Sequence, residues 1–333
     1  MFSRRSTGLS AATRRVFFTA IIASLSLTVA SIVVSADEPA FPLRAQRILF
    51  LGDSITHAGG YVNLIEAELR LRHRAGDTSI PQVPEIVNIG LSSETCSGLS
   101  EPDHPFPRPD VHERLDRALD QVKPDLVVAC YGMNDGIYYP FSEERFAAYR
   151  RGIDLLIQKV HAIDAILILI TPPPFDPVPL KDSGKLLPAG QEKYAYFAMF
   201  EDYDNVLKKY GEWIMEQRDR VEMVINIHQP VTAALAAARK NDPAFTMAPD
   251  GIHPNSAGHR VIAQTILKAW GLQLREEFPA GFMELMNQRG TVLHDAWLSH
   301  VGHQRPGVKA GLPLQEATTK ADELLDQAMN LVP

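Results

Sequence analysis

The stretch ILFLGDSITHAGGY, residues 48–61, runs from four apolar residues into Gly52-Asp53-Ser54 and then into a polar, glycine-rich turn. A short apolar run that ends on turn residues is typical of a buried strand. The serine at its end lies either in an ordinary turn between a strand and a helix or in the position of a nucleophile. The residues that follow the other apolar runs of the chain decide between these two interpretations.

Four more apolar runs follow the first one along the chain. The five runs are Ile48–Leu51, Glu85–Ile89, Leu126–Cys130, Ala165–Ile170 and Val221–Ile227. They are nearly continuous in apolar residues, which favours strands that are buried on both faces of a parallel sheet. Helical patterns lie between them, at 61–74, 111–122, 142–161 and 194–217. This alternation predicts a flavodoxin-like, three-layer α/β/α sandwich around a five-stranded parallel sheet.

The first 36 residues have the composition of a signal peptide. They contain four arginines and no acidic residue, and an apolar run at 17–34 leads to Val34-Ser35-Ala36, a small-x-small cleavage pattern. Cleavage after Ala36 would accompany export to the periplasm or the extracellular space. The pair Arg14-Arg15 also fits the twin-arginine export route, and an uncleaved membrane anchor is the alternative.

The chain beyond the helical pattern at 256–270 differs from the alternation that precedes it. Residues 271–333 contain two helical patterns, at about 280–300 and 313–331, and no apolar run of the strand type. We therefore expect a domain at residues 45–270 and a helical C-terminal extension, residues 271–333, that packs on it. Two proline-rich segments inside the domain, at 102–110 and 171–191, are candidate walls of a substrate site.

Charge and cysteine content limit the classes of function. The formal net charge is −7, and removal of residues 1–36 would make it −11. An acidic surface argues against nucleic-acid binding and against docking on anionic membranes. Cys96 and Cys130 leave both a disulfide and two free thiols open. No cysteine or histidine spacing indicates a metal site, so we expect no metal. Because the surface is acidic and the apolar run would be removed by cleavage, we also expect no stable membrane association.

Polar residues stand where the apolar runs end. Ser54 follows the first run, Asn134 follows the third, and Asp250 and His253 lie beyond the fifth. Ligands of parallel α/β sheets bind at the carboxyl ends of the strands, so these side chains are expected to converge on one edge. A serine hydroxyl becomes a nucleophile when a neighbouring base takes its proton and a carboxylate orients that base. His253 and Asp250, three residues apart, suit these two roles.

Acyl transfer also requires donors for the oxyanion that forms on the substrate. The amide N–H of Ser54 and the side-chain amide of Asn134 are two candidates, and a backbone N–H after the second apolar run is the natural third. The chain order serine, aspartate, histidine is that of α/β-hydrolases, but the G-x-S-x-G motif of that fold is absent.

Four segments of the chain together resemble the sequence blocks of the SGNH (GDSL-type) hydrolases in order and spacing. They are GDSIT (52–56), NIGLSSETCSG (88–98), GMNDG (132–136) and DGIHPNSAGH (250–259). The resemblance covers roughly residues 45–270. It implies Ser54 as the nucleophile, Asp250 and His253 as its partners, and Asn134 as a donor to the oxyanion.

The second segment departs from the pattern of that family, which places a glycine at its oxyanion position. Alignment on Asn88 and Thr95 puts Ser93 at this position, and Gly90 is the alternative donor. A backbone N–H survives such a replacement, although a positive φ would cost a serine about 1 kcal/mol. Asp53 and Tyr138 are further candidates for substrate contacts, with packing as the alternative role of the tyrosine.

These observations predict an exported serine esterase that hydrolyses short-acyl, chiefly acetyl, esters. The loops at the expected site are polar and rich in proline, and no long apolar lid is present to shelter a fatty chain. Within the family this resembles the carbohydrate acetylesterases, with a small-molecule or polysaccharide ester as substrate and no cofactor. A lysophospholipase or thioesterase activity is one alternative, and a non-catalytic glycan-binding protein on the same fold is another.

Overall fold

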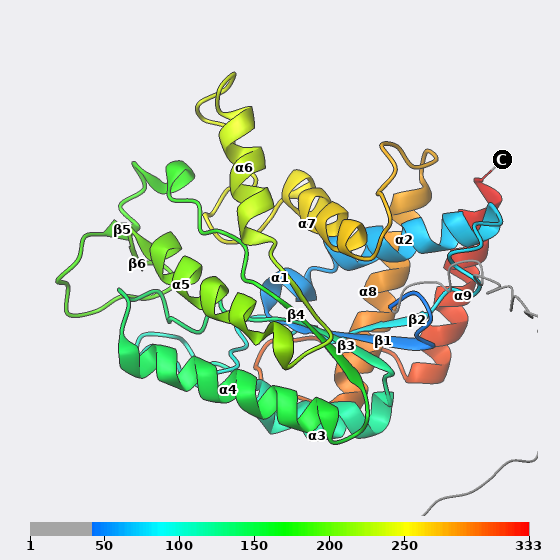
Figure 1. Cartoon of the computed structure of the whole chain (residues 1–333), viewed down its shortest axis with the longest axis horizontal. Helices are drawn as coiled ribbons and strands as arrows, with labels where there is room; N and C mark the ends of the chain where they lie inside the picture. Colours follow the sequence, from blue (N-terminus) through cyan, green and yellow to red (C-terminus); the bar gives the residue numbers. More distant parts are fainter. Residues whose placement is uncertain (1–41, 333) are drawn as a thin grey trace, which may run out of the picture. The chain divides into compact units, whose positions relative to one another are not determined.

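A parallel sheet of five strands forms the centre of the described chain, residues 42–332 of the computed structural model (Figure 1). The strands are β1 (Arg47–Gly52), β2 (Glu85–Asn88), β3 (Leu126–Cys130), β4 (Ile166–Ile170) and β7 (Met223–Ile225). Their spatial order is β2-β1-β3-β4-β7 and every pairing is parallel, which confirms the predicted flavodoxin-like sheet. The predicted signal peptide lies outside the described residues.

The register of the sheet brings the carboxyl ends of its strands into one row. Gly52 at the end of β1 pairs with Cys130, Cys130 pairs with Ile170, and Ile170 pairs with Ile225. The central strands are buried along almost their whole length, which explains why their sequences are apolar without alternation. The segments that leave this row meet at one edge of the sheet.

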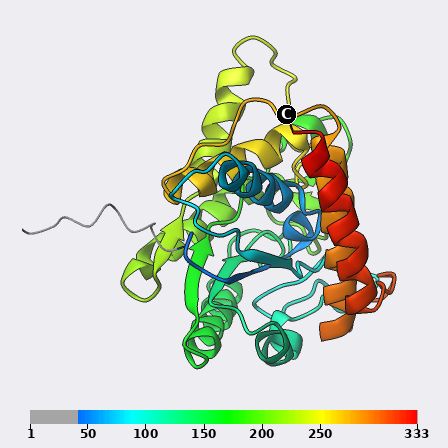
Figure 2. The same cartoon turned by 90° about the vertical axis from the view of Figure 1, so that its right-hand side faces the viewer.

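Helices cover both faces of the sheet (Figures 1 and 2). They are α2 (Gly60–Arg74), α3 (Val111–Val122), α4 (Glu143–His161), α5 (Tyr203–Met215) and α7 (Ser256–Ala269). Helices α2 and α7 pack together on one face, while α3 and α4 pack together on the other, with α5 against α4. Asp110 and Ser142 cap α3 and α4 by accepting hydrogen bonds from backbone amides of the first turn, and the cap at Ser142 fits the predicted helix start.

The predicted helix at 194–217 is wrong in its first third, because α5 begins only at Tyr203. Ala195 and Ala198 exchange two backbone hydrogen bonds of 2.9 Å and so form a tight turn. Met199–Phe200 then form β6, which pairs with β5 (Leu186–Leu187). Met199 is buried, but burial of a single residue is compatible with a strand as well as with a helix.

Shorter elements connect these layers. A single helical turn, α1 (Ser54–His57), follows β1 directly, and α6 (His228–Ala238) follows β7. Two 3₁₀ turns, η1 (Val178–Leu180) and η2 (Glu216–Asp219), lie in the connections after β4 and α5. The loop before α7 belongs to the same edge of the sheet as α1, so the chain returns there after α6.

The C-terminal extension consists of α8 (Phe282–Val301) and α9 (Leu314–Asn330). Helix α8 contacts β2 as well as α2 and α3, so it lies along the free edge of the sheet and joins the two helical layers, and α9 packs on α8 (Figure 2). Leu298 and Val301 of α8 belong to the main hydrophobic core. The extension therefore covers an edge strand that would otherwise expose unpaired backbone groups.

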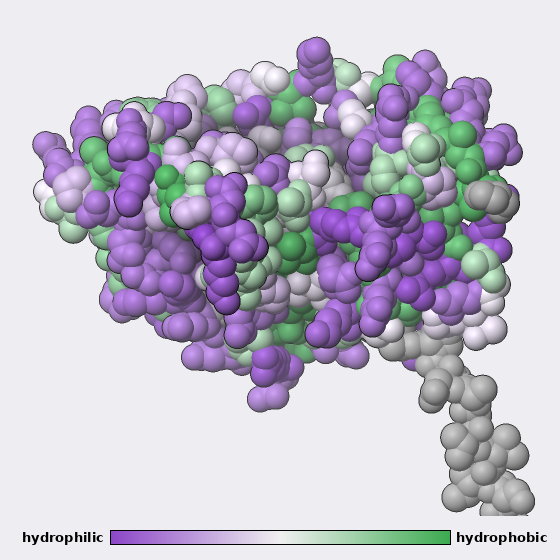
Figure 3. Space-filling view, turned by 90° about the horizontal axis from the view of Figure 1, so that it is seen from above, coloured by the Kyte–Doolittle hydropathy of each residue, from purple (hydrophilic) through white to green (hydrophobic). Residues whose placement is uncertain are grey.

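Hydrophilic residues occupy most of the face drawn in Figure 3, with hydrophobic residues in smaller patches between them. Within residues 42–332, no helix combines the length and the apolar content that crossing a bilayer requires. The described cysteines, Cys96 and Cys130, are both buried free thiols, which settles the question of a disulfide left open by the sequence.

Candidate active site

The turn after β1 presents Ser54 at the carboxyl edge of the sheet, as the quoted stretch suggested. Gly52 leaves no space for a side chain, because a Cβ atom there would lie 2.8 Å from the carbonyl oxygen of Cys130. Asp53 then caps α1, its Oδ1 accepting a hydrogen bond of 2.9 Å from the amide of Ile55. The first residue of α1 is Ser54, whose amide therefore lies among the unpaired donors of a helix start.

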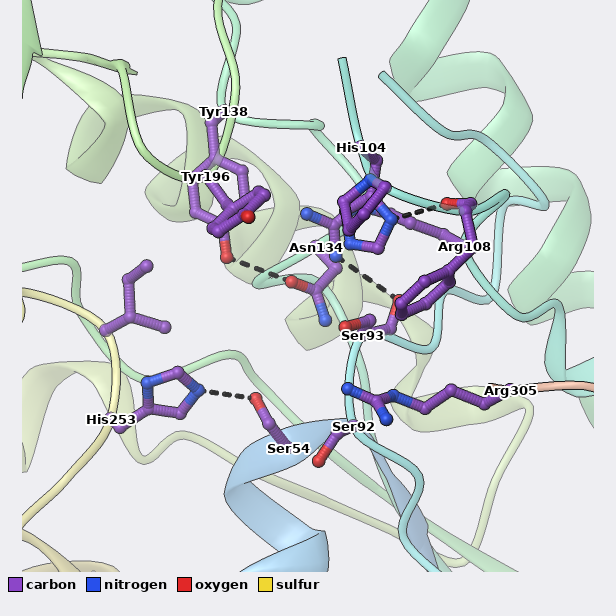
Figure 4. Close-up of a pocket in the computed structure, with 13 residues that line it drawn as sticks. Ser54, Ser92, Ser93, His104, Arg108, Asn134, Tyr138, Tyr196, His253 and Arg305 are labelled. Carbon is purple, nitrogen blue, oxygen red and sulfur yellow. Dashed lines mark hydrogen bonds between the residues drawn. The ribbon is translucent and has the colours of Figure 1, made fainter. Parts of the chain in front are cut away.

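Ser54, His253 and Asp250 form a continuous hydrogen-bonded series. His253 Nε2 lies 2.8 Å from Ser54 Oγ, as Figure 4 shows, and His253 Nδ1 lies 2.6 Å from Asp250 Oδ2. Asp250 Oδ1 also accepts the amides of Ile252 and His253, at 3.0 and 2.8 Å. The carboxylate therefore holds both the imidazole and the loop that carries it.

These contacts shift the pKa values of both titratable groups. Burial opposes ionisation of Asp250, but the hydrogen bonds from His253 and from the two amides outweigh it and hold the pKa of this carboxyl well below its usual range. The hydrogen bond to Asp250 raises the pKa of His253, and burial opposes this shift. A carboxylate that stays ionised beside a histidine stabilises the imidazolium that forms when the histidine accepts a proton.

The position of Ser93 distinguishes it from Gly90. Ser93 lines the pocket at Ser54, whereas the amide of Gly90 already donates to Asn88 Oδ1 at 2.9 Å. Among residues 42–332, the amides of Ser54 and Ser93 have no hydrogen-bond acceptor. Ser93 has a φ of 69°, the left-handed conformation that disfavours a serine, so it occupies the backbone geometry expected of a glycine.

The side chain of Asn134 lies in the same pocket and is held at both ends. Its Nδ2 donates to the carbonyl oxygen of Glu94 at 3.1 Å, and its Oδ1 accepts a hydrogen bond of 2.9 Å from the Tyr138 hydroxyl. An amide nitrogen carries two hydrogens, so one remains for a ligand. Tyr138 lines the pocket with its ring while its hydroxyl fixes which way the Asn134 amide faces (Figure 4).

The structure corrects the predicted role of Asp53 as a substrate contact. Its side chain is 3% exposed, does not line the pocket, and serves as the cap of α1. Burial raises the pKa of this carboxyl to about 7, and the nearby positive charge of His253 and the hydrogen bond from Ile55 oppose that shift. Asp53 nevertheless lies close enough to His253 for its negative charge to raise the pKa of that histidine.

Buried ion pairs, which the sequence did not indicate as site residues, anchor the loop that carries Ser93. Arg114 of α3 donates to both oxygens of Glu94 at 2.7 Å, and the Tyr131 hydroxyl donates to the same carboxylate at 2.7 Å. Arg108 binds Glu101 through two hydrogen bonds of 2.5 and 2.6 Å and also donates to the carbonyl oxygen of Ser93 at 3.3 Å. An arginine on the apolar face of α3 is the signal that could have revealed the first pair.

The C-terminal extension also reaches this region. His294 of α8 donates from Nε2 to the carbonyl oxygen of Gly90 at 2.9 Å, and the same oxygen lies 3.2 Å from His57 Nδ1. Arg305, which follows α8, lines the pocket together with Ser54 (Figure 4). No sequence motif pointed to either residue, because both lie in the extension outside the four matching segments.

The pocket has a volume of about 320 Å³. One side of it carries what we call the aromatic rim, His104, Phe106 and Tyr196. The ring centroids of His104 and Phe106 are 4.6 Å apart, and those of His104 and Tyr196 are 5.5 Å apart. Tyr196 is 42% exposed, so the rim extends from the pocket to solvent.

Comparison with known proteins identifies the fold family. Residues 50–261 match the GDSL-like lipase/acylhydrolase family. The chain is similar to the solved structure of a variant of Axe2, an acetyl-xylooligosaccharide esterase from Geobacillus stearothermophilus, with 21% identity, a TM-score of 0.49, and coverage of 70% of this chain and 97% of that one. It is also similar to LAE5, an α/β hydrolase from the metagenome of Lake Arreo, Spain, with 23% identity, a TM-score of 0.43, and coverage of 68% of this chain and 95% of that one. A third similar structure is that of the acetyl xylan esterase AlAXEase, with 21% identity, a TM-score of 0.44, and coverage of 67% of this chain and 98% of that one.

The comparison with curated proteins gave no match. Since the family match spans more than half of the chain, the resemblance drawn from the four segments is confirmed, and the chain belongs to the GDSL-like lipase/acylhydrolase family of ester-bond hydrolases.

Proposed function

We propose that the protein hydrolyses acetyl and similarly short acyl esters carried on carbohydrate, with Ser54 as the nucleophile. The observation that carries the proposal is the series Ser54–His253–Asp250, at 2.8 and 2.6 Å, beside the unpaired amides of Ser54 and Ser93. A nucleophile, a base with its orienting carboxylate and oxyanion donors within one pocket are the groups that two-step acyl transfer requires.

In the first step, Ser54 Oγ attacks the carbonyl carbon of the ester and its proton passes to His253 Nε2. The oxyanion of the tetrahedral intermediate accepts hydrogen bonds from the amides of Ser54 and Ser93 and from Asn134 Nδ2. His253 then gives its proton to the departing alcohol oxygen, which leaves an acyl group on Ser54. Asp250 stays ionised throughout and stabilises the imidazolium.

In the second step, water attacks the acyl-enzyme while His253 takes one of its protons. The same three donors hold the second oxyanion, and its collapse releases the carboxylic acid and returns the proton to Ser54 Oγ. The chain's own residues supply every proton transfer in this scheme, so the proposed reaction needs no cofactor.

Two features support a short acyl group on a sugar. The pocket of about 320 Å³ lies at the lower end of ligand-site volumes, and the groups nearest Ser54, including Ser92 and Ser93, are polar. The aromatic rim offers flat apolar faces at the entrance, and sugars present C–H groups that pack on such faces. A long acyl chain would instead need a continuous apolar channel.

The proposed location of the protein is outside the cytoplasm, after cleavage behind Ala36. The composition of residues 1–36 supports this, since four arginines precede an apolar run and a small-x-small step. Acetylated polysaccharides outside the cell would then be within reach of the enzyme.

The test compares hydrolysis of p-nitrophenyl acetate and p-nitrophenyl octanoate by residues 37–333 and by the Ser54→Ala variant. We expect acetate to be preferred and the variant to lose about three orders of magnitude or more in kcat/KM. A preference for octanoate would move the substrate class to lipids. Equal inertness of both proteins towards both esters, and towards acetylated oligosaccharides, would favour a glycan-binding role on this fold.

A further inference from the structure

Arg305 brings a guanidinium group from the C-terminal extension into the pocket of Ser54. It lies in the segment between α8 and α9 and lines the pocket with Ser92 and Ser93. In Figure 4 its side chain extends towards Ser54 and Ser92, with the guanidinium at the tip. The side chain is therefore placed to meet whatever group of a substrate enters beside the reacting serine.

Arg305 has no carboxylate partner in the part of the chain that the structure describes. Within residues 42–332, no aspartate or glutamate forms an ion pair with it, its Nη1 donates to the carbonyl oxygen of Pro306 at 2.9 Å, and its Nε is buried without a hydrogen-bond partner. Burial lowers its pKa, and no acidic group opposes that shift. Arg108, the second guanidinium of the pocket, differs because Glu101 neutralises it through two hydrogen bonds.

The other titratable groups around Arg305 do not supply the missing negative charge. His57, His104 and His303 are near enough to feel its charge, and for each of them burial is the main cause of a lowered pKa. A histidine is either neutral or cationic, so none of these three groups offers an anion. Asp250, the carboxylate at the opposite side of Ser54, is already engaged with His253.

Arg305 is continuous with the aromatic rim. Its guanidinium carbon lies 5.2 Å from the centroid of the Phe106 ring, which itself contacts His104 and, through it, Tyr196. This cation–π contact helps to hold the guanidinium, and within residues 42–332 its Nη2 has no hydrogen-bond acceptor, so it is available to a ligand. The rim that would hold the sugar therefore has a cation at its inner end.

We propose that Arg305 binds a carboxylate or sulfate on the sugar that bears the ester, so that the preferred substrate is an O-acetylated acidic carbohydrate. The inference rests on the proposed function and names the substrate class of that same site. A planar guanidinium pairs with the two oxygens of such an anion through parallel hydrogen bonds. An acidic sugar would thus be held with its ring against the rim and its acetyl group towards Ser54.

The test uses methyl glucuronoside acetate and methyl glucoside acetate, which differ in the carboxylate. We expect the wild-type protein to favour the acidic ester by about tenfold or more in kcat/KM, and Arg305→Gln to bring this ratio down to about one. Arg305→Lys should restore part of the ratio, because it returns the charge without the planar fork. Lys309→Gln, which removes an exposed cation of the same segment, is the matched control and should keep the wild-type ratio.

A second measurement does not depend on turnover. Binding of methyl glucuronoside and methyl glucoside to Ser54→Ala, followed by calorimetry, should show tighter binding of the acid, and the added Arg305→Gln change should abolish the difference. Thermal unfolding of each variant confirms that it is folded. If Arg305→Gln does not fold, the comparison of the two glycosides on Ser54→Ala alone still decides, since equal affinities contradict the proposal.

Several outcomes would overturn the assignment. The first is an equal kcat/KM of the wild-type protein on the two acetates, and the second is an equal loss of kcat/KM on both acetates in Arg305→Gln. The third is a preference for p-nitrophenyl hemisuccinate over p-nitrophenyl butyrate that depends on Arg305, because this would place the anion on the acyl group. Failure of the proposed function looks different, because then p-nitrophenyl acetate would not be hydrolysed at all. Hydrolysis that depends on Ser54 without any discrimination by charge would leave the esterase standing and remove only the role of Arg305.

Discussion

His294 donates a hydrogen bond of 2.9 Å to the carbonyl oxygen of Gly90, a residue 204 positions earlier in the chain. The bond joins α8 to the loop that follows β2 and that carries Ser93 three residues later. His57 Nδ1 lies 3.2 Å from the same oxygen, and the rings of His57 and His294 meet at a centroid distance of 4.4 Å. The extension thus takes part in fixing the loop that carries Ser93, the proposed oxyanion donor.

Replacing His294 by alanine should impair both stability and activity. The loss of a buried hydrogen bond and of ring contacts should lower the free energy of unfolding by about 1–3 kcal/mol. Displacement of the Ser93 amide should also reduce kcat/KM on p-nitrophenyl acetate by roughly tenfold or more. Urea unfolding and steady-state kinetics measure the two effects, and unchanged kinetics in the folded variant would separate α8 from the site.

Substitution should be tolerated at Ser93 but not at Gly90, the two candidate donors after β2. Ser93→Gly keeps the backbone N–H and relieves a positive φ, so we expect activity within a few-fold of wild type and a change in stability of at most about 1 kcal/mol. Gly90→Ala places a Cβ against the backbone of His57 and should disturb α1 and the pocket. Kinetics and thermal unfolding of the pair test this, and a Ser93→Gly variant as impaired as Gly90→Ala would contradict the assignment.

Tyr138→Phe should reduce turnover while leaving the pocket wall in place. The hydroxyl of Tyr138 is the partner that fixes Asn134 Oδ1, and without it the amide can turn its oxygen towards the substrate. We expect kcat to fall by about 10- to 100-fold with a smaller change in KM, because the oxyanion exists only after attack. A rise in KM with kcat unchanged would show instead that the hydroxyl contacts the substrate itself.

The pH profile of kcat/KM should have an acid limb above the ordinary histidine pKa of 6.5, because His253 must be neutral to accept the proton and its pKa is raised. Activity is therefore lost as the pH falls through the raised pKa. Asp53→Asn should move this limb to lower pH, since the negative charge of Asp53 adds to the stabilisation of the imidazolium. Asparagine can still accept the amide of Ile55, so the cap of α1 is kept, and a limb that stays in place or moves upward contradicts the prediction.

The pair Glu94–Arg114 offers a test of how the second loop is anchored. Arg114→Met leaves a fully buried carboxylate without its cation, which should cost about 3–5 kcal/mol in the free energy of unfolding at pH 7. The double variant Glu94→Gln with Arg114→Met removes both charges and should recover part of that loss. Denaturant unfolding of the single and double variants measures the coupling, and additive losses would mean that the pair does not act as a unit.

The site residues that could be predicted from the sequence are marked by patterns in their neighbouring residues, whereas those that were missed are not. Ser54 and Asn134 stand three and four residues after the ends of apolar runs, and His253 lies three residues from Asp250, so each could be placed from its near neighbours in the sequence. The position of Ser93 required alignment with a family whose glycine it replaces. The apolar spacing before α5 is compatible with a strand as well as with a helix, and there the predicted start of the helix was wrong.

The extension residues could not be predicted because their contacts are distant in sequence. His294 and Arg305 lie on a helix and a loop with no motif, and what gives them their places is the packing of α8 across the sheet edge. The buried cap at Asp53 was misread for a related reason, since whether an acidic residue of a turn faces solvent or the helix start depends on side-chain direction. Side-chain direction and long-range packing are properties of the folded chain.

The covering of β2 by α8 sets an order of assembly. All five strands have been synthesised by Ile225, whereas the helix that covers the edge begins at Phe282. Until α8 docks, the backbone of β2 is open to pairing with a strand of another molecule, and the interval lengthens if the chain crosses a membrane unfolded. The yield of refolded protein should therefore fall as the protein concentration rises, because molecules aggregate at this edge. A peptide of residues 282–301 added during refolding should cover β2 and raise that yield.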